Sequence, residues 1–303
     1  LKAAEVWVKD ESRNPTWSFK DRHAAVTLST ARELGAHTVV VSTSGNHGAA
    51  VAAYAARGSL RCVALTYPGV PAPVRVLMQA YGAEVVVTTP EGRWALMREA
   101  VREHGWYPAS NYTDIPTSGA YGHDGYKTIA YELHEQLGSV TPDLVVVPTA
   151  YAEGLYGVWK GFEELAILGR IAGAPRMIAA EPEGGPLGAA FERGDGIARV
   201  PRRPTVARGI GGTVNSYLGV AALSASDGMV AQATDAEILV AQRDLAARLV
   251  AGALDGLEDQ ADGGLVVLDV GREAALVAHA RRHALAVDDL LQRLEHLGAV
   301  AHR

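Results

Sequence analysis

Short apolar runs alternate with longer amphipathic segments along the chain from about residue 37 onward. The runs "HTVVVST", "LRCVALTY", "AEVVVTT" and "PDLVVVPT" are rich in β-branched residues, and between them lie segments such as "NHGAAVAAYAARG" and "GRWALMREAVREHG". Apolar runs of about 4–8 residues followed by about 10–15 residues with a helical period are typical of βαβ units. The pattern therefore predicts an α/β fold built on parallel sheets.

The ends of the helical segments support this prediction. Four of them reach a glycine, as expected where a helix stops in a left-handed conformation: Gly58, Gly82, Gly105 and Gly138. Farther along, "RMIAAEPEG" predicts a strand, "GPLGAAFERG" a helix, and "TDAE" a capping box in which Thr234 precedes a long helix. The 303 residues exceed what one hydrophobic core usually serves, about 250–300 residues, so we expect two lobes and a doubly wound architecture.

Composition narrows the classes of function. A formal net charge of −6 and an isoelectric point near 5.9 argue against a nucleic-acid-binding surface. No apolar run approaches the roughly 18 residues of a membrane span, and no signal peptide is visible, which predicts a cytoplasmic protein. The single cysteine, Cys62, lies in an apolar run and is expected to pack as a small hydrophobe. Basic and acidic residues alternate in "ARRHALAVDDLLQRLEHLG", which predicts a solvated helix face.

The stretch "NPTWSFKDR" is the first candidate for chemistry. It places Lys20 after a proline-containing turn, between Phe19 and the pair Asp21 and Arg22, where Ser18 is positioned to cap a helix. A nucleophilic lysine needs a neutral amine part of the time, and burial lowers the pKa of an ammonium group. Taken alone, this stretch is more typical of a solvated lysine in the first turn of a helix.

The stretch "STSGNHGAA", residues 42–50, joins a predicted strand to a predicted helix. A loop of small residues at a helix N-terminus presents free backbone N–H groups and can bind a phosphate or a carboxylate. Gly45 allows close approach, and Asn46 offers a side-chain donor. A tight turn with a Ser or Asn cap is the alternative. His47, in the first helical turn, is expected to be structural rather than a general base.

Together, the two stretches resemble the fold-type II pyridoxal-phosphate enzymes, which include threonine synthase, the threonine and serine dehydratases and the cysteine synthases. The resemblance extends over most of the chain, through "PDLVVVPTAYAEGLYGVWKGFEEL" and "TDAEILVAQRDLAAR". It implies a smaller α/β lobe at residues 24–118 and a larger cofactor-binding lobe at 1–23 plus 119–303. It further implies pyridoxal 5'-phosphate as cofactor, no metal, a homodimer, and a Schiff base between Lys20 and the cofactor aldehyde.

The same resemblance assigns the other site residues. Asn46 is expected to hydrogen-bond the pyridine hydroxyl, and Lys127 to lie near an anionic group of the substrate. The substrate carboxylate is expected on the backbone of Ser42, Thr43, Ser44, Gly45 and Asn46. The phosphate of the cofactor is expected in a cup made by Ala150, Tyr151, Ala152, Glu153, Gly154 and Leu155.

Two features favour the threonine synthase branch: "NPTWSFKDR" itself, and "HDGYKTIAYELHEQLG", which resembles an "EGxKT" segment with Asp124 in place of Glu. A phosphorylated substrate needs a second anion site, for which Lys127, Arg208 and His123 are candidates. Lys127 as an ordinary lysine on a helix surface stays open as the alternative.

Three departures from the family pattern are visible. Trp17 stands where Gly is usual, which could alter the pocket or serve packing elsewhere. Glu153 places a negative charge in the phosphate cup, which costs affinity for a dianion unless the side chain points outward. The hydroxyl partner of the pyridine nitrogen is not recognisable in "ARLVAGALDGL" or "LVVLDVGREAALVAH". The abrupt joins there, and a start at Leu1, suggest that segments of the complete protein are missing.

The resemblance thus predicts a pyridoxal-phosphate-dependent, threonine synthase-like lyase that acts on O-phosphohomoserine or a related activated amino acid, by elimination followed by addition of water or another nucleophile. A serine or threonine dehydratase or a β-replacement synthase is the alternative enzyme, because "SGNHG" is nearer to the dehydratases. A non-catalytic cofactor-binding relative is the alternative from another class. "RVPRRPTVARGIGG", between Gly184 and Gly212, predicts a loop at the active site or at a lobe boundary.

Overall fold

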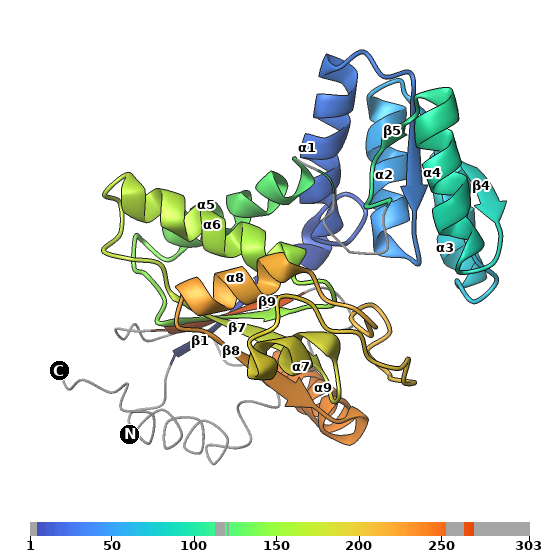
Figure 1. Ribbon diagram of the computed structural model, residues 1–303. Coiled ribbons are helices and arrows are strands. Elements are labelled where there is room, and N and C mark those ends of the chain that lie inside the picture. The colour runs from blue at the N-terminus through green and yellow to red at the C-terminus, as the bar shows by residue number, and fades with distance from the viewer. Residues whose placement is uncertain (1–4, 113–118, 120, 253–263, 270–303) are drawn as a thin grey trace.

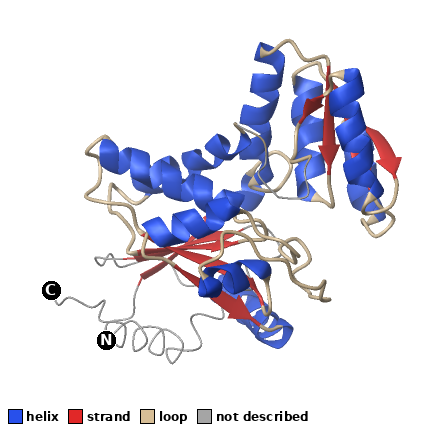
Figure 2. Ribbon diagram, viewed as in Figure 1, coloured by secondary structure: helices blue, strands red, loops and turns tan. Residues whose placement is uncertain are grey.

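The computed structural model describes residues 5–112, 119, 121–252 and 264–269. These residues form two β-sheets with helices packed on them, and the two sheets occupy separate parts of the molecule (Figures 1 and 2). Every strand pairing between the named strands is parallel. The predicted α/β fold with mostly parallel, doubly wound sheets is confirmed.

The larger sheet has the strand order β1-β9-β6-β7-β8. Its strands are β1 (Glu5–Asp10), β6 (Leu144–Pro148), β7 (Arg176–Pro182), β8 (Met229–Ala233) and β9 (Gly264–Asp269). The helices α5 (Lys127–Gln136), α6 (Glu153–Ile167) and α8 (Tyr217–Ala225) lie on one face, and α7 (Pro186–Arg193) and α9 (Asp235–Gly252) lie on the other (Figure 1).

The smaller sheet has the order β4-β3-β2-β5. Its strands are β2 (Thr38–Ser42), β3 (Arg61–Thr66), β4 (Glu84–Val87) and β5 (Tyr107–Pro108), and its helices are α1 (Lys20–Glu33), α2 (Asn46–Arg57), α3 (Ala72–Ala80) and α4 (Gly92–His104). Two short 3-10 helices, η1 (Glu11–Arg13) and η2 (Gly122–Tyr126), precede α1 and α5.

Each sheet has its own hydrophobic core. In the larger sheet, Val145 and Val147 of β6 pack with Phe162 of α6, and Val146 points to the opposite face with Ile238 of α9. This alternation is the period of two that a strand buried on both faces requires. In the smaller sheet the buried Cys62 belongs to the core, and burial raises the pKa of its thiol to about 12. The prediction that Cys62 packs as a small hydrophobe is confirmed.

The predicted helix ends are confirmed with one exception. Gly82, Gly105 and Gly138 adopt positive φ angles of 85°, 63° and 61°. Gly58 has a φ of −81°, and the next residue, Ser59, takes the left-handed position with a φ of 56°. The prediction for Gly58 was therefore wrong by one residue, because the chain reverses one position later.

The predicted capping box at α9 is confirmed. The Glu237 amide donates to Thr234 Oγ1 at 3.3 Å, and the Thr234 amide donates back to Glu237 Oε2 at 2.7 Å. The residues of the solvated helix face predicted near the C-terminus lie outside the described residues. Among the described residues, no helix is long and apolar enough to cross a membrane. The division into lobes at 24–118 and at 1–23 plus 119–303 stays a prediction, which the two separate sheets support.

Candidate active site

The predicted anchor, Lys20, is the first residue of α1. The residues after it hold the helix start in place. The buried Asp21 carboxylate accepts hydrogen bonds from the Thr16 amide and hydroxyl at 3.1 and 2.8 Å. The Arg22 guanidinium donates to both carboxylate oxygens of the buried Glu11, at 2.6 and 2.8 Å. Such a bidentate pair is geometrically specific, so these neighbours orient Lys20. Ser18 does not cap the helix, because the N-cap is Phe19 and no side chain caps it.

The amine of Lys20 is held by a tyrosine distant in sequence. Lys20 Nζ donates to the Tyr126 hydroxyl at 3.0 Å and lies 4.7 Å from the centre of the Phe19 ring. Lys20 is half-buried, and Tyr126 is fully buried. Burial acts to lower the pKa of Lys20, but the interactions with Tyr126 and Glu153 outweigh it and the pKa lies above its ordinary value. The expectation of a lowered pKa therefore does not hold for the free amine.

A glycine contact places Tyr126 at Lys20. A Cβ atom built on Gly125 would lie 2.0 Å from the Arg22 carbonyl oxygen, so only glycine lets η2 approach the first turn of α1 this closely. The motif "HDGYKT" drew attention to Lys127, whereas the structure brings its neighbour Tyr126 into the site. Sequence reasoning missed Tyr126, although the glycine before it was a signal of close backbone approach.

The turn between β2 and α2 contains the predicted carboxylate site. Ser42 and Thr43 are buried, and their amides donate to Ser110 Oγ and to the carbonyl oxygen of Leu65, both at 3.0 Å. Ser44 and Asn46 are exposed. The buried amides therefore complete the turn. The exposed part of the turn, at the N-terminus of α2, is where an anion can be received.

Thr43 uses its side chain within the same turn. Its hydroxyl accepts from the Gly45 amide at 3.1 Å and from the Gly48 amide at 2.9 Å. A Cβ atom on Gly48 would lie 2.4 Å from Thr43 Cγ2, whereas one on Gly45 would meet nothing within 4 Å. Gly48 is thus required by packing, and the space above Gly45 is open.

The turn between β6 and α6 contains the predicted phosphate cup. It ends at Ala152, which adopts a left-handed φ of 65°, and α6 begins at Glu153. The first amides of a helix have no intrahelical acceptor, so the N-terminus of α6 suits an anion. Gly154 allows Phe19, the neighbour of Lys20, to approach, because a Cβ there would lie 3.0 Å from the Phe19 ring. The cup and Lys20 are therefore adjacent.

Glu153 does not point outward. It is 6% exposed, and its charge acts on Lys20, Tyr126 and Tyr151, raising the pKa of each. The cup therefore combines a helix N-terminus, which attracts an anion, with a buried carboxylate, which repels one.

Two histidines line the inner side of the site and stay neutral. Burial, and then the charge of Lys20, lower the pKa of His47 to about 3. His47 Nε2 lies 2.9 Å from the Ala109 carbonyl oxygen, which fixes the neutral tautomer with a proton on Nε2. The ring centre of the buried His23 lies 4.8 Å from that of His47. Both contacts fit a structural role for His47.

The predicted anion-binding lysine is engaged elsewhere. Lys127 Nζ pairs with Glu164 Oε1 at 2.7 Å and with Asp124 Oδ1 at 2.9 Å. These pairs join α5, η2 and α6. His123 packs with its ring centre 5.3 Å from that of Tyr156. Trp17, with a φ of 60°, is 62% exposed, so its indole is not buried in a core.

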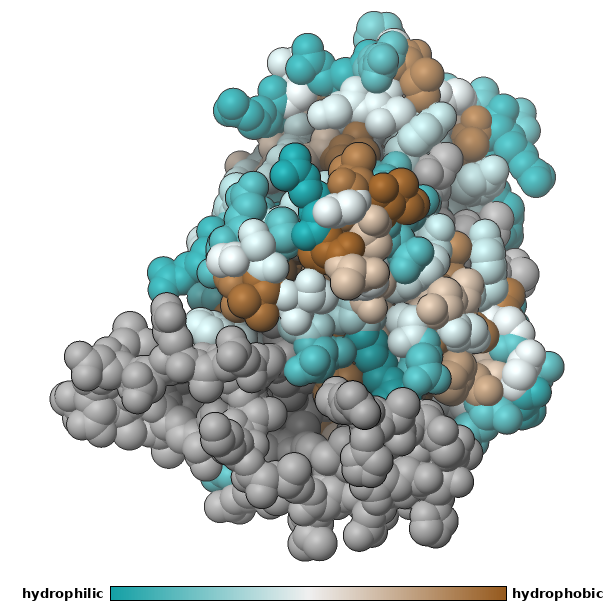
Figure 3. Space-filling model, turned by 90° about the vertical axis from the view of Figure 1, so that its left-hand side faces the viewer, coloured by the Kyte–Doolittle hydropathy of each residue, from teal (hydrophilic) through white to brown (hydrophobic). Residues whose placement is uncertain are grey.

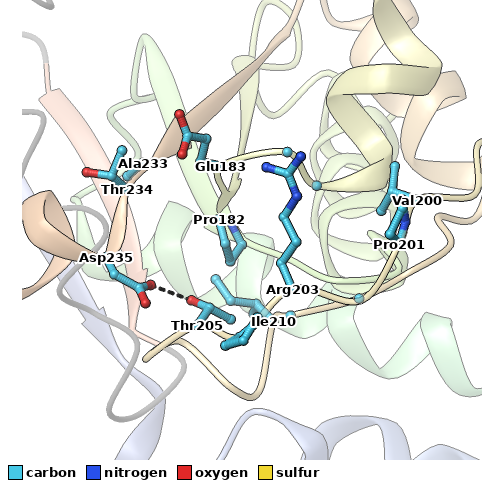
Figure 4. A pocket seen from close by; sticks show the side chains of 15 residues that line it. Pro182, Glu183, Val200, Pro201, Arg203, Thr205, Ile210, Ala233, Thr234 and Asp235 are labelled. Atoms are coloured by element: carbon cyan, nitrogen blue, oxygen red, sulfur yellow. Dashed lines mark hydrogen bonds between the residues drawn. The ribbon is translucent and has the colours of Figure 1, made fainter.

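A cavity of about 230 Å³ lies at the carboxyl ends of β7 and β8 (Figure 4). The predicted loop "RVPRRPTVARGIGG" forms one of its walls, and Thr205 of this loop donates to Asp235 at 2.7 Å. The cavity adjoins the β6–α6 turn, because a Cβ on Gly212 would lie 3.5 Å from Ala150. Lys20 is not among the residues that line it.

Comparison with known proteins identifies the family. The sequence model of the pyridoxal-phosphate dependent enzymes matches residues 1–254, and the chain belongs to that family. Its cofactor is accordingly pyridoxal 5'-phosphate, as predicted. The threonine synthase of Methanocaldococcus jannaschii is 32% identical over 300 residues, which cover 94% of this chain and 71% of that protein. The threonine synthase of Synechocystis is 37% identical over 251 residues, covering 81% of this chain and 62% of that protein.

Solved structures agree on the fold. Maize serine racemase superposes with a TM-score of 0.71 at 22% identity, covering 97% of this chain and 89% of that one. The processed form of threonine deaminase isoform 2 from Solanum lycopersicum superposes with a TM-score of 0.70 at 20% identity, covering 92% and 83%. The predicted fold-type II architecture and the resemblance to threonine synthase are confirmed.

Binding of this cofactor needs an amine for the aldehyde, a site for the phosphate and a partner for the pyridine nitrogen. The described residues fit the first two. Lys20 supplies an amine in a partly enclosed position, and the N-terminus of α6 beside it supplies helix-terminal amides for the phosphate. The segments predicted to hold the partner of the pyridine nitrogen extend beyond residue 252 and beyond residue 269, outside the described residues.

Proposed function

We propose that this pyridoxal-phosphate-dependent enzyme removes a leaving group from the β or γ carbon of an amino acid and then adds water or another nucleophile. The observation that carries the proposal is the position of Lys20. Its amine lies between Tyr126 and the N-terminus of α6, and its charge reaches His47 in the first turn of α2. One nucleophilic amine is thus near both candidate anion sites.

Each part of the site has a defined task in this proposal. Lys20 would hold the cofactor aldehyde, and the amides that open α6 would hold its phosphate. The backbone amides of the exposed residues Ser44 and Asn46 would hold the α-carboxylate of the substrate. Bound pyridoxal phosphate supplies an electron sink for the α-carbon of the amino acid. The Nζ of Lys20 takes and returns protons at the α and β carbons, and Tyr126 positions that amine between transfers.

The covalent role of Lys20 is tested by the absorbance spectrum of the purified protein. We expect a visible band that borohydride abolishes, with a pyridoxyl group left on the peptide that contains residue 20. Lys20→Ala should lack both signals. Lys160→Ala, which removes a half-buried lysine of α6, should retain them. A modified peptide that does not contain residue 20 would contradict the assignment.

The reaction is tested by its products. A threonine synthase-like enzyme should release phosphate from O-phospho-L-homoserine. A serine or threonine dehydratase, the alternative favoured by "SGNHG", should instead form an α-keto acid from serine or threonine. If neither product forms although the Schiff-base band is intact, the result favours a non-catalytic relative. Because Lys127 is paired with two carboxylates, the proposal gives it no direct contact with the substrate.

We also propose that the enzyme is a cytoplasmic homodimer. The family resemblance supports this. Exposed apolar residues at the end of α6 also support a dimer, because Ile167 and Leu168 are 81% and 71% exposed. Apolar side chains also gather on the face shown in Figure 3. Light scattering of the purified protein measures the mass directly.

A further inference from the structure

Arg93 lies beside the turn that would receive the substrate carboxylate. It is in the first turn of α4, and its Nη1 donates to the Thr43 carbonyl oxygen at 3.3 Å. Its guanidinium carbon lies 4.8 Å from the ring centre of Tyr67 and 5.5 Å from that of Trp94. Aromatic contacts of this kind hold a guanidinium group in a defined position.

The topology of the smaller sheet explains why these residues meet. Thr43 follows β2, Tyr67 follows β3, and Arg93 comes after β4, and these three neighbouring strands are parallel. Their carboxyl ends therefore share one edge of the sheet. In open α/β sheets this is the edge at which ligands bind.

The charge of Arg93 is not held in a salt bridge with any described residue. Arg22 and Arg61 each form a salt bridge with a glutamate, whereas no salt bridge within the described part of the chain includes Arg93. Its hydrogen bonds go to carbonyl oxygens, those of Thr43 and Pro90. A half-buried guanidinium group without a carboxylate partner can still form charge-assisted hydrogen bonds with a ligand.

Groups from both halves of the molecule act on Arg93. Burial lowers the pKa of Arg93; the nearby phenols of Tyr67 and Tyr151 and the charge of Glu91 oppose this, and the charge of Arg202 adds to it. Tyr151 precedes α6 in the phosphate cup, and Arg202 is an exposed residue of the loop that borders the cavity.

We propose that Arg93 binds an anionic group at the end of the substrate's side chain. The substrate would then be an amino acid with a second anion, its α-carboxylate at Ser44 and Asn46 and its side-chain phosphate or carboxylate at Arg93. The inference rests on the proposed function, because it assigns the substrate class of that same site.

The test is a spectral titration of the holoenzyme, in which the shift of the absorbance band gives an apparent Kd for each amino acid. Arg93→Gln should weaken O-phospho-L-homoserine about tenfold or more, as expected when charge-assisted hydrogen bonds to an anion are removed. The Kd for L-homoserine, which lacks the second anion, should stay within about twofold. Arg102→Gln, which removes an exposed arginine from the same helix, should change neither.

Further measurements identify the bound anion and show whether the variants are folded. Parallel titrations with L-glutamate decide between phosphate and carboxylate, since the larger loss marks the anion that Arg93 binds. The unfolding temperature of Arg93→Gln should stay close to that of the wild-type protein, which shows that the fold is kept. Arg93→Lys should restore part of the affinity.

The proposal is overturned if Arg93→Gln weakens charged and uncharged amino acids equally, or weakens neither. Equal weakening would mean that Arg93 only shapes the turn at Thr43. A wild-type protein without a Schiff-base band would instead overturn the proposed function, and this separates the two failures.

Discussion

The turn between β2 and α2 and the turn between β6 and α6 both join a buried parallel strand to the N-terminus of a helix, yet they differ in what fills them. The first contains small residues, and the space above Gly45 is open. The second contains Tyr151 and the buried carboxylate of Glu153. The backbone alone would make both turns anion sites of similar strength. The side chains make the second one selective, because any anion there must coexist with Glu153.

Lys20 lies beside the second turn and within electrostatic reach of the first. The buried Tyr126 holds its amine, and the interactions with Tyr126 and then with Glu153 raise the pKa of that amine. We therefore propose that the first turn recognises a ligand, and that the second holds the cofactor phosphate and acts on Lys20.

The largest expected effect is from Gly125→Ala. The added methyl group would meet the backbone of Arg22 at 2.0 Å, and backbone cannot move aside as a flexible side chain can. We expect a loss of about 3 kcal/mol or more in the free energy of unfolding, measured with denaturant, together with a weaker Schiff-base band. A variant with unchanged stability would show that η2 does not pack on α1 as described.

Glu153→Gln should strengthen cofactor binding by about tenfold, because it removes a negative charge from the phosphate cup. The substitution should also lower the pKa of the Lys20 amine, since Glu153 raises it. Equilibrium binding of pyridoxal phosphate and competitive labelling of lysines, read by mass spectrometry, measure the two effects. Glu183→Gln, which changes a glutamate bordering the cavity, serves as the control. Weaker cofactor binding by Glu153→Gln would reverse our interpretation of the second turn.

The neutral histidines predict a dependence of stability on pH. The pKa of His47 is about 3 in the folded protein against an ordinary value of 6.5, so the unfolded chain binds more protons between these values. This contribution to stability is present above pH 6.5 and is lost as the pH falls toward 3. His47→Gln should flatten the decline of the unfolding temperature in that window. An equally steep decline in the variant would contradict the assignment.

Gly45→Ala should have the smallest effect on stability. It tests directly whether the turn between β2 and α2, rather than the turn between β6 and α6, receives the carboxylate. No atom lies within 4 Å of the added Cβ, so the free energy of unfolding should change by less than about 1 kcal/mol. The methyl group should nevertheless hinder a carboxylate that approaches the turn, and raise the apparent Kd of an amino acid in the spectral titration. Unchanged affinity would place the carboxylate elsewhere.

The sequence by itself determined the elements and the family. Apolar runs and helical periods predicted the strands β2, β3, β4, β6 and β7, and a local motif predicted the capping box at Thr234. Such features depend on residues a few positions apart, so they can be read from the chain. The motifs around Lys20 and Asn46 were enough to predict the cofactor, because the residues that carry them are contiguous.

Only the tertiary structure decided where the side chains point. The contact of Lys20 with Tyr126 spans 106 positions, and that of Arg93 with Thr43 spans 50. The sequence could not show that Glu153 points inward, because the direction of a side chain at a helix start depends on the elements packed against it. For the same reason Lys127, predicted near the substrate, pairs with Glu164 across two packed helices.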